Sequence, residues 1–179
     1  MKYVILLLTI LLVFACKNER TPNKNTIENK KETIVNDDVL SITIEVRTKE
    51  ADKFELYYTD DLPESGFTAD KRIAVYTPGG DDFQTLTFTL PNEVWPYKLR
   101  LDLGENNNKY ETPVEIKSII FKLNSNSFVI DSSIMGSFFD TNAYIEPISN
   151  GYNRKVLEGK YDPFLVAKPV LIKKMEIEL

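Results

Sequence analysis

The chain has 179 residues, enough for one domain, and its 27 acidic and 22 basic residues give a net charge of −5, which disfavours nucleic acid as a partner. It contains no histidine and a single cysteine. These counts exclude Ser-His-Asp and Cys-His catalysis, zinc sites of the His/Cys type and a disulfide framework. We expect no cofactor and no bound metal, although the oxygen-rich loop from Gly104 to Asn108 leaves a structural calcium ion open.

Residues 1–15 are predicted to be a secretory signal peptide. Met1 and Lys2 precede an apolar run from Tyr3 to Ala15, and Cys16 follows directly. As a helix this run is only about 20 Å long, short of the roughly 30 Å hydrocarbon core of a bilayer. We therefore expect the run to be cleaved rather than to span the membrane.

The end of this run, Val13-Phe14-Ala15-Cys16, resembles the lipobox of bacterial lipoproteins. The resemblance implies cleavage before Cys16, a diacylglycerol on its thiol and acylation, with palmitate, of the new amino terminus. It also implies attachment to the cell envelope, in the outer membrane of a Gram-negative bacterium, because Lys17 stands where an inner-membrane retention signal has Asp. The alternative is an ordinary signal peptide followed by a chance cysteine.

Residues 16–37 are predicted to be a lipidated, flexible tether. The segment from Lys17 to Asn36 is polar, mixed in charge and without aromatic residues or a helical or strand period. Such a composition buries too little apolar surface to offset the entropy of ordering the chain. A short edge strand through Ile34 and Val35 is the alternative.

Residues 38–179 are predicted to form an all-β domain, an antiparallel β-sandwich. Apolar and polar residues alternate in about seven short segments separated by turn residues, which is typical of half-buried strands. In Val114–Leu123 the alternation slips by one residue, which predicts a β-bulge near Lys117 and Ser118. Asn124-Ser125-Asn126 predicts a short hairpin turn. The segments begin or centre on Leu40, Phe54, Ile73, Leu86, Leu99, Val114 and Phe128.

The last third of the chain has weaker signals. Ser132 to Phe139 is a short helical candidate, although it contains Gly136. From Asp140 to Pro169, proline and glycine interrupt every pattern, so we expect an irregular segment that is functional or wraps over a sheet edge. Val170 to Leu179 is predicted to be a closing strand.

The stretch from Pro96 to Leu123 resembles the jelly-roll, galactose-binding-like domains of bacterial surface and polysaccharide-related proteins. The resemblance implies that one sandwich face or its loops bind sugars, and it maps onto Arg100 and Asp102. By strand spacing, Lys98, Arg100 and Asp102 share one face at intervals near 6.6 Å. In this interpretation Arg100 donates hydrogen bonds to sugar hydroxyls and Asp102 accepts them, while aromatic rings stack on the sugar. The rings proposed for stacking are those of Trp95, Tyr57 and Tyr76.

Each of these residues also has a structural interpretation. Lys98, Arg100 and Asp102 form a solvated ladder of ion pairs in this alternative, and Trp95 fills a gap in the core. Carboxylate pairs for glycoside hydrolysis arise by chance among 27 acids, so we expect no enzyme. Two hypotheses remain: a lipid-anchored glycan-binding or glycan-associated sandwich, and a structural or interaction subunit of an envelope assembly without a small-molecule ligand.

Overall fold

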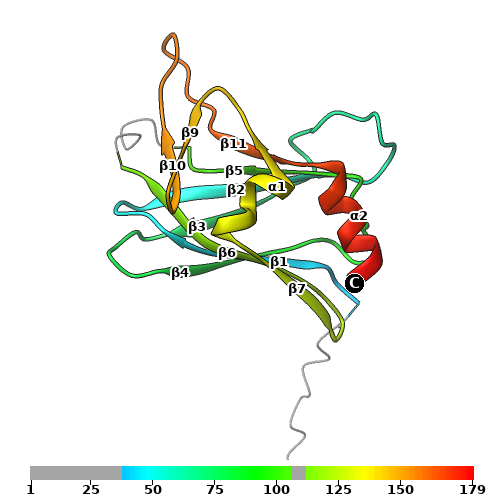
Figure 1. Ribbon diagram of the computed structural model, residues 1–179. Helices are drawn as coiled ribbons and strands as arrows, with labels where there is room; N and C mark the ends of the chain where they lie inside the picture. The colour runs from blue at the N-terminus through cyan, green and yellow to red at the C-terminus, as the bar shows by residue number, and fades with distance from the viewer. Residues whose placement is uncertain (1–37, 106–111) are drawn as a thin grey trace, which may run out of the picture. The chain divides into compact units, whose positions relative to one another are not determined.

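The computed structural model describes residues 38–105 and 112–179. The predicted signal peptide, Cys16 and the tether through residue 37 lie outside the described residues, as do positions 106–108 of the candidate calcium loop. The described chain forms two antiparallel sheets that face each other as layers (Figure 1). The predicted all-β sandwich is confirmed.

The first sheet, called sheet A, has the strand order β4-β1-β6-β10-β9, and β7 also pairs with β6. Its strands are β1 (Ser41–Arg47), β4 (Gln84–Thr89), β6 (Val114–Leu123), β7 (Asn126–Asp131), β9 (Ile145–Ile148) and β10 (Gly151–Arg154).

The second sheet, called sheet B, has the order β3-β2-β5-β11-β8. Its strands are β2 (Asp52–Thr59), β3 (Arg72–Thr77), β5 (Lys98–Asp102), β8 (Phe139–Thr141) and β11 (Phe164–Ala167). A 3-10 turn (Ser132–Ile134), the short helix α1 (Met135–Phe138) and the longer helix α2 (Pro169–Glu178) complete the fold.

The core lies between the inner faces of the two sheets, because alternate residues of each strand turn the same way. In β1, Ile42, Ile44 and Val46 are buried while their neighbours are only half-buried. In β5, Leu99 and Leu101 are buried in the same way, which leaves the residues between them on the outer face of sheet B. Period-2 alternation therefore predicted both the strands and their faces.

Two finer predictions are also confirmed. Ser118 of β6 pairs with Glu45 of β1, whereas Ile116 pairs with the next residue of β1, Val46, so Lys117 is the extra residue of a bulge. The β6–β7 hairpin turns through Asn124, whose φ of 55° lies in the left-handed region that asparagine tolerates.

The prediction of an irregular segment from Asp140 to Pro169 was wrong in part. The structure places β9, β10, β11 and most of β8 there, as strands of three or four residues. Strands this short offer at most two residues to each face, so their alternation cannot be distinguished from chance in the sequence.

The prediction of a closing strand from Val170 to Leu179 was wrong, because this segment is helix α2 (red in Figure 1). Pro169 occupies its first turn, where the missing N–H costs nothing. Leu171, Met175 and Leu179 follow at intervals of four, and they pack against the core. The helical period is present in the sequence, but the alternation of Met175, Ile177 and Leu179 with glutamates also fits a strand.

None of the helices in the described residues is long and apolar enough to cross a bilayer.

Candidate functional site

The residues predicted to bind a ligand lie mainly on the outer face of sheet B. Lys98, Arg100 and Asp102 project from β5 between the buried leucines of that strand. Tyr57 of β2 lies directly opposite Arg100 in the strand register. The fold thus brings Arg100, Asp102 and Tyr57 together.

Arg100 is held on this face by contacts within the protein. Its Nε lies 2.6 Å from Asp102 Oδ1 and its Nη2 lies 2.8 Å from Asp102 Oδ2, a two-pronged pair. Nη2 also donates to Asp162 at 2.6 Å. The guanidinium carbon lies 3.7 Å from the ring centre of Phe164 and 5.3 Å from that of Tyr57. Its Nε and Nη2 donors and its flat face are therefore engaged before any sugar arrives.

The other residues predicted to bind a ligand make their contacts elsewhere. Lys98 donates to the carbonyl of Ser65 at 2.9 Å. Trp95 is half-buried and packs against the core, as its structural interpretation expected. Tyr76 is exposed on the edge strand β3, opposite Lys53 of β2. The structure does not assemble the three aromatic residues into one stacking platform.

The Asp102 carboxyl has an unusual proton affinity. Burial raises its pKa to about 6, and the nearby carboxylates of Asp162 and Glu55 act in the same direction, while the hydrogen bonds from Arg100 oppose the rise. The folded state therefore holds a proton on Asp102 more tightly than the unfolded chain, in which an aspartate titrates near pH 4.

This difference predicts how stability depends on pH. Because the pKa of Asp102 is raised on folding, the free energy of unfolding should fall as pH rises from about 4 through about 6. Asp102→Asn should flatten that decrease in urea unfolding curves measured across the window. Asp82→Asn, at an exposed position between β3 and β4, is the control for removing one negative charge. An equal decrease in the wild type and Asp102→Asn would contradict the prediction.

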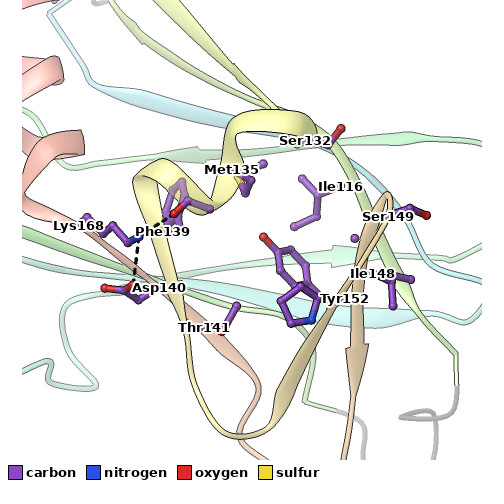
Figure 2. A pocket seen from close by; sticks show the side chains of 13 residues that line it. Ile116, Ser132, Met135, Phe139, Asp140, Thr141, Ile148, Ser149, Tyr152 and Lys168 are labelled. Atoms are coloured by element: carbon purple, nitrogen blue, oxygen red, sulfur yellow. Dashed lines mark hydrogen bonds and ion pairs between the residues drawn. The ribbon is translucent and has the colours of Figure 1, made fainter.

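A pocket of about 320 Å³ lies elsewhere in the fold, where β8, β9, β10 and α1 meet (Figure 2). Thirteen residues line it. About half are apolar, and the others carry hydroxyl groups, backbone amides and two opposite charges. The lining residues are Ile116, Ser132, Met135, Gly136, Phe139, Asp140, Thr141, Pro147, Ile148, Ser149, Gly151, Tyr152 and Lys168.

Tyr152 is the central polar group of this pocket. The residue is only 7% exposed, and Figure 2 shows its hydroxyl directed into the space below α1. This hydroxyl makes no hydrogen bond within the described residues. Burial raises the pKa of Tyr152 to about 12, so the group remains a protonated donor at neutral pH. Because the hydroxyl faces the open pocket and not packed protein, it is free to bond to a polar group that enters the pocket.

Asp140 and Lys168 form an ion pair on one side of the pocket (Figure 2). Lys168 Nζ lies 3.3 Å from Asp140 Oδ1 and donates to the carbonyl of Gly136 at 2.7 Å. These two are the charged residues of the lining, so the pocket is neutral as a whole. The ammonium group of Lys168, a donor, and the carboxylate of Asp140, an acceptor, therefore lie side by side in the pocket lining.

Sequence analysis missed this pocket. Its residues come from six elements between β6 and the start of α2, and eight of the thirteen lie in the segment expected to be irregular. The one signal available was the length of that segment, because long stretches without obvious structure in compact domains are often functional.

The protein is thus an antiparallel β-sandwich that contains a small, partly polar cavity without net charge. Within the described residues, no group of three or more His, Cys, Asp or Glu side chains is placed to hold a metal ion. The chain matches no known family model, and no curated protein or solved structure is significantly similar to it.

Proposed function

We propose that this chain is a lipid-anchored protein of the bacterial cell envelope that binds glycans in the pocket around Tyr152. The anchor would be a lipid on Cys16, with residues 17–37 as the tether. The lipid would be inserted in the outer membrane of a Gram-negative cell. The sandwich would then hold the binding pocket outside the bilayer.

The observation that carries this proposal is the unpartnered hydroxyl of Tyr152 in a pocket of mixed character. Sugars present hydroxyl groups around their edges and C–H groups on their faces. The pocket supplies matching groups, with the Tyr152 hydroxyl, the Thr141 side chain and apolar side chains such as Ile116 and Met135, whereas the hydroxyls of Ser132 and Ser149 point away from Tyr152 (Figure 2). The cluster around Arg100 supports binding less well, because several of its polar groups already satisfy one another.

Glycan arrays probed with the detergent-purified full-length chain test this function. We expect binding to a subset of glycans, loss of that binding in Thr141→Trp, and retention in Arg100→Lys. Figure 2 shows the Thr141 side chain directed toward Tyr152, so a tryptophan at this exposed position should occupy the pocket. Thermal melting of each variant checks that the fold is retained.

The opposite pattern, with binding lost in Arg100→Lys and retained in Thr141→Trp, would keep a glycan-binding function but move it to the outer face of sheet B. No binding to any glycan would contradict the proposed function. The chain would then be better described as a structural or interaction subunit of an envelope assembly.

A further inference from the structure

The charges around the pocket restrict which sugars it can accept. A ligand carboxylate or phosphate entering the pocket would approach Asp140 as well as Lys168. Lys168 Nζ already lies 3.3 Å from Asp140 Oδ1 and donates to the carbonyl of Gly136, so an anion would have to compete with both partners for it. Like-charge contact with Asp140 and loss of the existing ion pair would both oppose binding of an acidic sugar.

The volume of the pocket restricts the size of the ligand. About 320 Å³ is at the lower end of the range for ligand pockets, roughly 300–1,000 Å³. A single sugar ring with its hydroxyl groups is a ligand of this small size. The remaining units of a longer glycan would stay outside the pocket and add few contacts.

We infer that the pocket binds one neutral sugar unit, with the hydroxyl of Tyr152 bonded to a sugar hydroxyl and the Asp140–Lys168 pair excluding acidic sugars. This inference rests on the proposed glycan-binding function and specifies its ligand class. Tyr152 determines affinity because its hydroxyl is otherwise unpaired. Asp140 determines specificity because its carboxylate cancels the charge of Lys168.

Matched ligands test the exclusion of charge. The probes are the methyl glycosides of glucose and galactose, each paired with the methyl glycoside of the corresponding uronic acid, which differs only by oxidation of C6. Isothermal titration of the detergent-purified full-length chain should show at least one neutral glycoside binding about tenfold or more tightly than its acidic partner. Asp140→Asn should narrow that ratio, since Lys168 would be left without its partner. Asp82→Asn, on the connection between β3 and β4, should leave the ratio unchanged.

A second pair of variants tests the hydroxyl. Tyr152→Phe should weaken binding of the neutral glycoside about tenfold, as expected for the loss of one hydrogen bond. Tyr97→Phe removes an exposed hydroxyl outside the pocket and is its control. An oligosaccharide that contains the bound sugar should have an affinity within about threefold of that of the single sugar unit.

Three results would overturn the inference: uronic acids that bind as tightly as neutral glycosides, an unchanged affinity in Tyr152→Phe, or an oligosaccharide that binds more than about tenfold more tightly than one unit. Binding of acidic glycans alone would refute the inference and leave the proposed glycan-binding function intact. Absence of binding to any glycan on the array and to every glycoside in titration would refute both.

Discussion

Arg154→Met is expected to lower the free energy of unfolding by about 3–5 kcal/mol, because it leaves the carboxylate of Asp52 buried without its counter-ion. Arg154 Nη1 lies 2.6 Å from Asp52 Oδ2, and both side chains are 1% exposed. Methionine fills a similar length of space but carries no charge. Urea unfolding measured by circular dichroism gives the change directly.

The size of this effect follows from where the pair lies. Asp52 begins β2 in sheet B and Arg154 ends β10 in sheet A, so the pair joins the two sheets. Arg154 also donates to the carbonyl of Leu103 at 2.8 Å, and Asp52 accepts from the backbone N–H of Glu105 at 3.0 Å. Gly104 lies between these contacts, with a φ of 98°, and a Cβ there would come within 2.2 Å of Arg154 Nη1. Loss of Arg154 therefore also removes this donor from the carbonyl of Leu103.

An exposed ion pair provides the control. Lys49 and Asp81 lie 3.3 Å apart with side chains 69% and 88% exposed, so Lys49→Met should change stability by no more than about 0.5 kcal/mol. The double variant Asp52→Asn/Arg154→Met should lose less than the sum of the two single variants, because the second change removes a group already without its partner. A loss below about 1 kcal/mol in Arg154→Met would show that the pair is not structurally important.

Cys16→Ser is expected to abolish incorporation of palmitate and to move the protein from the membrane fraction to the soluble fraction of a cell lysate. Several acyl chains, each burying many methylene groups at about 0.8 kcal/mol apiece, make attachment effectively permanent. Serine lacks the thiol that the predicted lipidation requires. Metabolic labelling with palmitate followed by fractionation measures both effects.

Ser125→Ala is the matched control, since it alters a hydroxyl in the β6–β7 turn, far along the chain from the predicted lipobox. It should label and fractionate as the wild type does. Equal palmitate labelling of Cys16→Ser and the wild type would rule out Cys16 as the lipidation site. If Cys16→Ser moved to the soluble fraction but the wild type took up no palmitate, the result would point to a different anchor.

Much of the sandwich follows from local pattern. Alternation in β1 and β5 indicates which side chains face the core, the slip at Lys117 indicates a bulge, and Asn124 marks a hairpin turn. These features depend on residues close together in the chain, and backbone geometry converts their order directly into faces and turns. Arg100 and Asp102 share a face for the same reason, so their pairing was among the interpretations open at the outset.

The arrangement of the sheets, the sheet-joining ion pair and the pocket required the tertiary structure. Asp52 and Arg154 are separated by 102 positions, and nothing near either residue specifies the other as its partner. The pocket likewise depends on how short strands such as β9 and β10 pack beside α1, and the four residues of each strand do not encode this packing. Helix α2 shows the same limit, because alternating apolar residues fit a strand locally and only packing of Leu171 and Met175 into the core selects the helix. Local patterns specify local geometry, whereas sites assembled from distant segments are decided by which surfaces bury one another on folding.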